Sequence, residues 1–307
     1  MTEETARVAF IGFGEAASAF AAGWRARSDG SSAACAAYDI KTDSSNTAFR
    51  AAKQADYEAA AVTGYTTLDN ALDGRPLVFS LVTPDQALIA AQSAAGRLMP
   101  NALYLDGNSC SPGTKKRAAS VIDGAGGRYV DVAIMAPVSA AGHRTPLLLS
   151  GAHASSALKE LSGLDMVADL AEGPVGAASS VKMVRSIMVK GLEALIAECV
   201  LAGRSAGVDE AVFASLAKTF PGIDWPTTAS YMLERVATHG VRRAAEMGEV
   251  GAALRELGLD GPMTRAAADW QAAIGSLAIK LPPDSYQSRA DAILAGLKPD
   301  TKLRALP

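Results

Sequence analysis

The sequence predicts an α/β protein, with an N-terminal Rossmann domain built on a parallel sheet and an all-α C-terminal domain opened by a long interdomain helix. Three observations predict this class. Short apolar runs alternate with helical patterns over the first half of the chain, as in βαβ units. A glycine-rich turn follows the first run. After Gly173-Pro174 the pattern becomes helical throughout. We therefore expect two domains, 1–170 and 171–307.

The strands of the first domain are predicted from apolar runs that end at polar or turn-forming residues. RVAFI ends at Gly12, and AACAAY ends at Asp39. Pro84 and Pro112 follow later runs, and proline is tolerated in the first turn of a helix, so helices should begin there. The strand-like segments are 7–11, 33–38, 78–82, 103–105, 128–134 and 146–150.

The helices of the second domain are predicted from an apolar pattern that proline interrupts. Residues 177–206 contain no proline, and their only glycines are Gly191 and Gly203. This stretch predicts a helix of about 45 Å. Pro221, Pro226 and Pro262 break the pattern beyond it. The further helical segments are 209–218, 226–257 and 262–277, and we predict no strand among them.

Composition excludes several classes of function. The 307 residues carry 29 Lys and Arg against 32 Asp and Glu, a net charge of −3, which argues against nucleic acid as a partner. Three scattered cysteines make neither a disulfide framework nor a zinc site, and His143 and His153 lack companion ligands, so we expect no catalytic metal. The start MTEET is not a signal peptide, and no apolar run reaches the ~18 residues of a membrane span. We expect a cytoplasmic protein without a membrane partner.

The first candidate site is a dinucleotide fingerprint in VAFIGFGEAA. Gly12 permits a tight turn, Gly14 permits close approach of a pyrophosphate, and Ala17 keeps the following helix close to the strand. The helix N-terminus supplies amide donors and the positive end of its dipole. The alternative is an ordinary glycine-rich turn. Because the motif follows a strand and opens a helix, we favour the dinucleotide.

Asp39 ends the second apolar run, where a carboxylate can accept both hydroxyls of the adenosine ribose. It disfavours the 2′-phosphate of NADP, so NAD is the expected cofactor. Lys41 and Thr42 follow and keep NADP as the alternative. Glu15 is the discordant residue, since its carboxylate must point away from the phosphates. The predicted cofactor-binding residues are Gly12, Phe13, Gly14, Glu15, Ala16, Asp39, Val82 and Thr83.

Four segments in order make the chain resemble the β-hydroxyacid dehydrogenase family, which includes the 3-hydroxyisobutyrate and 6-phosphogluconate dehydrogenases. They are the fingerprint, DGNSCSP (106–112), YVDVAI (129–134) and GPVGAASSVKMVRS (173–186). The resemblance covers nearly the whole chain and implies an N-terminal Rossmann domain, a helical second domain and a nicotinamide cofactor. Its most specific part is the glycine-rich segment before the lysine of the fourth motif.

The resemblance implies roles for individual residues. The family's general acid/base lysine corresponds to Lys182, and the asparagine four residues on corresponds to Ser186. The Ser-Thr pair that binds the substrate carboxylate corresponds to Asn108 and Ser109. The Asp-Ala-Pro-Val-Ser-Gly-Gly segment becomes Asp131-Val-Ala-Ile-Met-Ala-Pro137, in which backbone amides near Ala133 and Ile134 would bind the acidic end of the substrate.

Helical spacing supports a role for Lys182 independently. Lys182 and Ser186 are one turn apart on one face, among apolar neighbours. Partial desolvation there would lower the lysine pKa toward the working pH. The alternative is a lysine that extends its ammonium to solvent, as we expect for Lys190.

A second lysine of the family is absent, because Ala245 and Glu246 occupy the positions of its Lys-Asp pair. His239, Arg243 and Glu246 share a helical face, and a guanidinium there would bind a carboxylate or phosphate. The alternative is a solvated face with an intrahelical Arg–Glu pair. The changes at the asparagine and at the second lysine indicate a divergent branch of the family.

The sequence therefore predicts an NAD(P)-dependent oxidoreductase that transfers a hydride between nicotinamide and the alcohol carbon of a small hydroxy acid. One alternative is an imine reductase, a group that typically carries Asp or Tyr at the position of Lys182. Another is a non-catalytic dinucleotide-binding protein. The apolar faces of the helical domain predict a homodimer or a larger assembly of identical chains.

Overall fold

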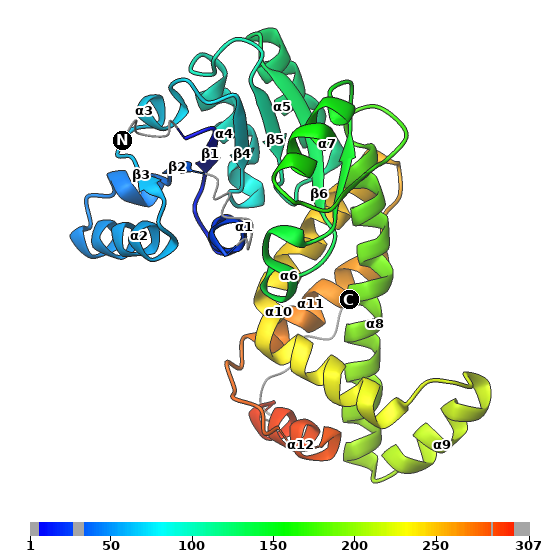
Figure 1. The fold of residues 1–307 in the computed structure, drawn as a ribbon. Helices are drawn as coiled ribbons and strands as arrows, with labels where there is room; N and C mark the ends of the chain where they lie inside the picture. The colour runs from blue at the N-terminus through cyan, green and yellow to red at the C-terminus, as the bar shows by residue number, and fades with distance from the viewer. Residues whose placement is uncertain (1–5, 27–33, 284, 298–307) are drawn as a thin grey trace. The chain divides into compact units, whose positions relative to one another are not determined.

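The computed structural model describes residues 6–26, 34–283 and 285–297, which form two units (Figure 1). The first unit is Met1–Lys182 and the second is Met183–Pro307, so the division falls inside one long helix. We had expected the boundary earlier, near residue 170, where the strands end. The units are described separately below.

The first unit is built on an eight-stranded sheet in the order β3-β2-β1-β4-β5-β6-β7-β8. Neighbouring strands are parallel except β6 and β7, which pair antiparallel with Asp131 opposite Ser150. We expected a parallel sheet, and β7 is the exception: the segment between β6 and β7, residues 135–146, returns the chain beside β6 in the opposite direction. The strands are β1 (Val8–Ile11), β2 (Cys35–Tyr38), β3 (Thr63–Gly64), β4 (Leu77–Ser80), β5 (Leu103–Asp106), β6 (Arg128–Ile134), β7 (Leu147–Ser150) and β8 (Ala168–Leu170).

Helices connect these strands and cover both faces of the sheet. They are α1 (Glu15–Arg25), α2 (Thr47–Ala60), α3 (Leu68–Leu72), α4 (Ala87–Ala95), α5 (Pro112–Gly124), α6 (Val138–Ala141) and α7 (Ala154–Gly163), with single 3₁₀ turns at Ile40–Asp43, Pro84–Gln86 and Gly142–Arg144. The helices expected after Pro84 and Pro112 are confirmed.

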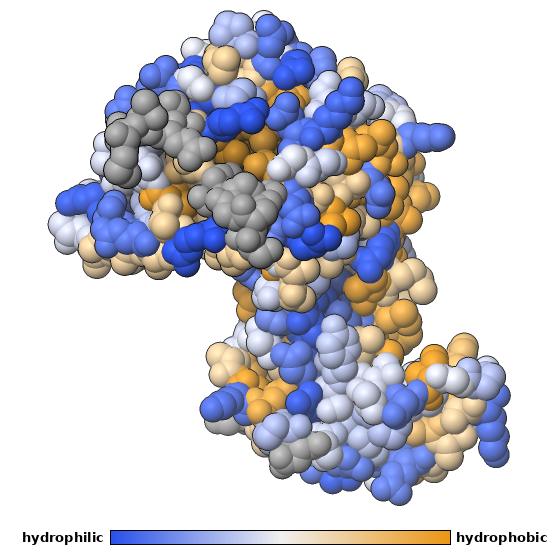
Figure 2. Space-filling model, viewed as in Figure 1, coloured by the Kyte–Doolittle hydropathy of each residue, from blue (hydrophilic) through white to orange (hydrophobic). Residues whose placement is uncertain are grey.

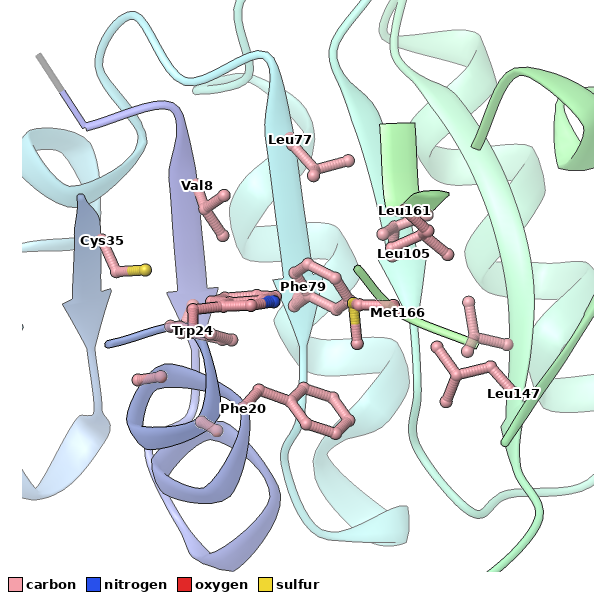
Figure 3. Packing of buried hydrophobic residues seen from close by; sticks show 14 of the residues in the cluster. Val8, Phe20, Trp24, Cys35, Leu77, Phe79, Leu105, Leu147, Leu161 and Met166 are labelled. Carbon is pink, nitrogen blue, oxygen red and sulfur yellow. The ribbon is translucent and has the colours of Figure 1, made fainter. Parts of the chain in front are cut away.

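Two apolar clusters, one on each face, hold the sheet in place. On one face Phe20 and Trp24 of α1 pack against Phe79 of β4, with ring centroids 6.1 and 6.0 Å from the Phe79 ring (Figure 3). On the other face Ala9 and Ile11 of β1 belong to a cluster with residues of α4 and α5. Alternate residues of β1 therefore enter different cores, which is why its sequence is continuously apolar.

The second unit is helical over its described residues. The long helix α8 (Ala177–Ala206) has the predicted bounds, and its later turns belong to this unit. It is followed by α9 (Asp209–Thr219), α10 (Trp225–Glu256), α11 (Pro262–Gly275) and α12 (Tyr286–Gly296). α10 and α11 cross closely at Gly240 and Gly275. A Cβ on Gly240 would lie 2.2 Å from the carbonyl oxygen of Gln271. Helix α12 was not predicted.

Two further observations apply to the part of the chain that the structure describes. None of its helices combines the length and the apolar character that crossing a membrane requires. That part of the chain contains no cluster of three or more His, Cys, Asp and Glu side chains that could bind a metal ion.

Candidate functional site

The residues predicted to bind a dinucleotide lie at the carboxyl ends of β1, β2 and β4. β1 has β2 on one side and β4 on the other, so the chain order reverses here, and such a switch point is where open α/β sheets bind ligands. Gly12 leaves β1 with φ +82°, and a Cβ there would lie 2.6 Å from the carbonyl oxygen of Leu81. Only glycine fits this turn.

Gly14 is the N-cap of α1 and lies exposed above the helix N-terminus. A Cβ on Gly14 would meet no other atom within 4 Å, so the space beside this backbone is open. Glu15 is also exposed, whereas Ala17 is fully buried and keeps α1 against β1. The open backbone and the free first-turn amides fit a pyrophosphate group.

Asp39 holds the glycine-rich turn from one side. Its Oδ2 accepts a hydrogen bond from the Phe13 amide at 2.9 Å, and its Oδ1 accepts one from the Lys41 amide at 3.0 Å. From the other side, the buried Lys53 donates from Nζ to the Phe13 carbonyl at 2.6 Å. The Phe13 amide is thus used within the chain, and its ring is buried 5.1 Å from that of Tyr57. Each carboxylate oxygen of Asp39 keeps capacity for a further hydrogen bond.

Thr42 and Lys41, the two residues that left NADP as the alternative cofactor, differ in their exposure to solvent. Thr42 is buried, and its hydroxyl lies 3.0 Å from the hydroxyl of Tyr57. Lys41 is exposed. Of this pair, only Lys41 is accessible from outside the protein.

The loops after β4 and β5 are joined by Asn108. Its Oδ1 accepts from the Val82 amide at 2.6 Å, and its Nδ2 donates to Ser80 Oγ at 3.0 Å and to Asp106 Oδ1 at 2.7 Å. The side chain is buried, in contrast to our expectation that it faces a substrate, because its amide satisfies three groups of its own domain. Ser109 is partly exposed, and Thr83 is exposed.

The other substrate residues expected in this unit lie on β6. Ala133 and Ile134 are opposite Leu148 and Leu147 of β7, so their backbone belongs to the sheet. Ala133 is buried and Ile134 is partly exposed.

Lys182 is partly buried in the second turn of α8, which Asp131 of β6 anchors to the sheet. The Asp131 carboxylate accepts from the amides of Gly176 and Ser179 at 3.1 and 3.0 Å, and from Ser179 Oγ at 2.5 Å. The amide of Ala178 donates to Ser150 Oγ at 3.0 Å. A carboxylate from a neighbouring strand thus caps the helix that carries the lysine.

Ser186, His239 and Arg243 lie in the second unit. Ser186 is buried and accepts a hydrogen bond from Lys190 Nζ at 3.0 Å. Lys190 is also buried, against our expectation, and its Nζ lies 3.1 Å from Glu246 Oε2. Its ammonium is retained inside because both groups accept from it.

Arg243 points into the unit rather than along a solvated face. Its NH1 donates to Glu193 Oε1 at 2.7 Å and Oε2 at 2.5 Å, and Gln271 Nε2 donates to the same carboxylate at 3.2 Å. The surface partner of Glu246 on α10 is instead Arg242. Burial, opposed by the attraction of Glu193, lowers the pKa of Arg243. We expected Arg243 to bind substrate, but its guanidinium neutralises a buried glutamate of α8.

His239 is partly exposed on α10. Burial first, and then the positive charges of Arg235 and Arg242, lower the pKa of its imidazole. This surrounding therefore favours the uncharged form of the imidazole.

Sequence reasoning missed the buried residues that organise the site, Lys53, Asp106, Lys115, Asp131 and Ser179. Asp131 carried a signal, because it is a charged residue inside the apolar strand YVDVAI and such a group must be paired. Lys115 carried none, since Lys115-Lys116 resembles an ordinary solvated pair.

We predict that Gly14→Val blocks the dinucleotide with little effect on folding. The added side chain enters the open space beside the α1 N-terminus, and loss of a glycine N-cap costs about 1 kcal/mol or less. NAD binding by calorimetry should weaken about tenfold or more. As the contrast, Gly12→Ala should lower stability in urea unfolding by at least about 1–2 kcal/mol, because Gly12 has positive φ and touches Leu81. Undiminished NAD binding by Gly14→Val would contradict the assignment.

Comparisons with known proteins agree with this fold. Residues 204–274 match a domain of unknown function (DUF1932). An uncharacterized 28.5 kDa protein from the 7S RNA 5′ region of Methanothermus fervidus is 30% identical over 143 residues, which are 47% of this chain and 54% of that protein. The chain thus spans about half the length of this curated relative.

Among solved structures, a conserved hypothetical protein from Sinorhizobium meliloti is 34% identical with a TM-score of 0.76, over 95% of this chain and 97% of that one. A conserved protein of unknown function, described as structurally similar to 3-hydroxyacid dehydrogenases, is 28% identical with a TM-score of 0.70, over 95% and 100%.

Two enzymes share the fold at lower identity. The 3-hydroxyisobutyrate dehydrogenase of Mycobacterium tuberculosis with L-serine is 15% identical with a TM-score of 0.72, over 92% and 97% of the chains. A reductive aminase from Aspergillus terreus in complex with NADPH is 18% identical with a TM-score of 0.53, over 89% and 93%.

Proposed function

We infer that the chain, which shares a family with the conserved hypothetical protein from Sinorhizobium meliloti, is a divergent member of the β-hydroxyacid dehydrogenase-like family. From this premise we propose that it is an NAD(P)-dependent oxidoreductase. Its reaction is the transfer of a hydride between nicotinamide and the alcohol carbon of a small hydroxy acid. The dehydrogenase is favoured over an imine reductase by the lysine at position 182, where imine reductases typically carry Asp or Tyr.

The observation that carries the proposal is the open N-terminus of α1 at the switch point, next to Asp39. The backbone at Gly14 would hold the pyrophosphate, and Asp39 would accept from the ribose hydroxyls. When bound, the nicotinamide supplies or accepts the hydride. The exposed Thr83 follows β4 at the same edge of the sheet.

Lys182 is the proposed general acid/base. In oxidation its neutral amine takes the proton of the substrate hydroxyl as the hydride leaves, and in reduction its ammonium returns that proton. Of the pair 108–109, only Ser109 is accessible, so we assign the hydrogen bond to the substrate carboxylate to Ser109 and a supporting role to Asn108. Ser186, one turn beyond Lys182, keeps its own hydroxyl proton available for donation.

The proposal is tested by a screen of small 2- and 3-hydroxy acids, including 3-hydroxyisobutyrate and L-serine, with NAD and with NADP. Formation of reduced nicotinamide, followed by its absorbance, is the expected result. Cyclic imines with NADH and NADPH form the parallel arm. Turnover of imines alone would replace the proposal by an imine reductase, and binding of dinucleotide without any turnover would indicate a non-catalytic protein.

We predict that NAD binds more tightly than NADP, because the Asp39 carboxylate repels a 2′-phosphate and Thr42 is buried. Asp39→Asn keeps an acceptor for the turn but removes the charge. A hydrogen bond to a charged group contributes about 1.5–3 kcal/mol, so NAD should weaken about tenfold in calorimetric titration while the preference over NADP narrows. Tighter binding of NADP by the wild type would mean that Lys41 outweighs Asp39.

We also propose that the protein is a homodimer or a larger homo-oligomer. Apolar residues recur on one side of α8 at spacings of three and four, and they are 40–62% exposed: Val181, Val184, Met188, Leu192 and Leu195. Hydrophobic surface is visible along the edge that α8 forms in Figure 2. An exposed apolar stripe of this length on a helix is typical of an interface.

Light scattering at micromolar concentration tests this assembly. Met188→Glu combined with Leu195→Glu should convert the wild-type oligomer to a monomer, because charges placed in an apolar interface are not compensated. The control, Met188→Leu with Leu195→Met, keeps the stripe apolar and should keep the assembly. A monomeric wild type would refute the proposal.

A further inference from the structure

Lys115 is a buried lysine to which the reaction itself assigns no role. It lies in α5, and its side chain is 0% exposed, as are those of Asp106 and Asp131. The Nζ donates to the Asp106 carbonyl at 2.5 Å and to Asp106 Oδ1 at 3.0 Å, and it lies 3.4 Å from Asp131 Oδ1. One ammonium thus bridges two carboxylates from adjacent strands.

The two carboxylates extend to different parts of the candidate site. Asp106 Oδ1 accepts from the backbone amide and the side chain of Asn108, which in turn holds the Val82 amide. Its Oδ2 accepts from the Tyr129 hydroxyl at 2.7 Å. Asp131 caps α8 through Gly176 and Ser179 and accepts from Ser150 Oγ at 3.0 Å. Lys115 is the only group of those named here that contacts both.

The charge balance favours this arrangement. Two carboxylates and one ammonium leave one negative charge in the interior, and it faces the positive N-terminal end of α8. Burial alone would lower the pKa of Lys115, but the attraction of Asp106 and Asp131 raises it above the usual value, so the ammonium persists. Displacement of α8 would leave Asp131 without its amide donors, which is costly in a buried site.

We propose that Lys115 is a positioning residue, which acts through Asp131 and Ser179 to hold the first turns of α8, and hence Lys182, in the geometry that proton transfer requires. Lys182 is three residues beyond Ser179, so the two are neighbours on one face of α8. The inference rests on the proposed acid/base role of Lys182. A misplacement of about 1 Å at a reacting group can lower a rate about 10²-fold.

Two adjacent serines give a matched test. Ser179→Ala removes the hydroxyl that donates to Asp131. Ser180→Ala removes a hydroxyl that donates to the Gly176 carbonyl, at 2.7 Å, at the start of α8. On the best hydroxy acid of the screen, Ser179→Ala should lower kcat about tenfold or more, with the NAD dissociation constant unchanged within about twofold. Ser180→Ala should retain wild-type kcat.

Lys115→Met gives the second variant, and it should lower kcat more than Ser179→Ala because both carboxylates lose their cation. If Lys115→Met does not fold, Lys115→Gln takes its place, because it keeps a donor beside the two carboxylates and removes the charge. Hydrogen exchange of the amides in 176–182 provides a readout independent of activity, and exchange should accelerate in Ser179→Ala and not in Ser180→Ala.

The outcomes separate this inference from the proposed function. Equal kcat and equal exchange in Ser179→Ala and Ser180→Ala, in an enzyme that Lys182→Ala inactivates, would overturn the positioning role alone. A reduced kcat with equally weakened NAD binding would also overturn it, because a general loss of structure would then explain both. A wild-type rate in Lys182→Ala would overturn the proposed function and this inference with it.

Discussion

Replacement of Lys182 by alanine should lower kcat for the best hydroxy acid by about 10²–10⁴, the usual contribution of a general acid/base. NAD affinity should stay nearly unchanged, since the groups at the N-terminus of α1 are untouched. The rate of oxidation by the wild type should rise with pH through one ionisation, and this rise should be absent from the alanine variant. Steady-state kinetics and calorimetric titration measure the two quantities.

Arginine at position 182 distinguishes acid/base chemistry from a fixed charge. A guanidinium stays protonated at any working pH and cannot accept the hydroxyl proton, so Lys182→Arg should not restore the rate. Lys159→Ala is the control, because replacing this exposed lysine of α7 removes the same charge outside the site. Near-normal rates in Lys182→Arg would show that only a positive charge is needed, and His239 would then be the next candidate for the proton.

The fold was predictable wherever the burial of a single strand or helix produces a recognisable pattern of apolar residues in its own sequence. Strands buried on both faces produce continuous apolar runs, and the proline-free stretch 177–206 predicted α8 with the observed bounds. The two-residue β3 is too short to produce a period, and β8, with Asp169 exposed in its centre, lacks an apolar run. The antiparallel direction of β7 depends on a connection whose course the sequence does not encode locally.

The cofactor side of the site was predictable because its residues depend on local backbone geometry. The turn requires Gly12 because of its positive φ, Gly14 lies two residues further on with open space beside its backbone, and Asp39 ends a strand next to that turn. The substrate side was less predictable. Asn108 is buried because Ser80 and Val82 approach it from another strand end, and this contact joins residues 26–28 positions apart in sequence.

Arg243 shows the same limit in the helical unit. Helical spacing grouped His239, Arg243 and Glu246, which all lie on α10, but spacing within one helix cannot identify a partner on another. Glu193 of α8 is 50 residues away, and it determines that the guanidinium turns inward. The pair is nearly inaccessible, with Arg243 and Glu193 side chains 9% and 3% exposed, so its removal has a large expected effect on stability.

Arg243→Leu should destabilise the protein by about 3–5 kcal/mol in urea unfolding followed by circular dichroism, because it leaves the Glu193 carboxylate buried without its cation. The neighbouring Arg242→Leu is the matched control. Arg242 forms an exposed pair with Glu246 one turn along α10, and such pairs contribute about 0.3–0.5 kcal/mol. A large difference between adjacent arginines of one helix would therefore reflect the buried pair.

The double variant Arg243→Leu with Glu193→Leu tests the cause of that loss. Replacing both partners removes the uncompensated charge, and buried ion pairs are often replaced by apolar residues at little cost, so the double variant should recover most of the stability. Gln271 Nε2 would keep the Lys190 carbonyl as its acceptor at 3.3 Å. If Arg243→Leu instead left unfolding unchanged and raised the KM of the hydroxy acid, Arg243 would bind substrate as the sequence first suggested. Because the guanidinium already satisfies Glu193, we expect the loss in stability to dominate.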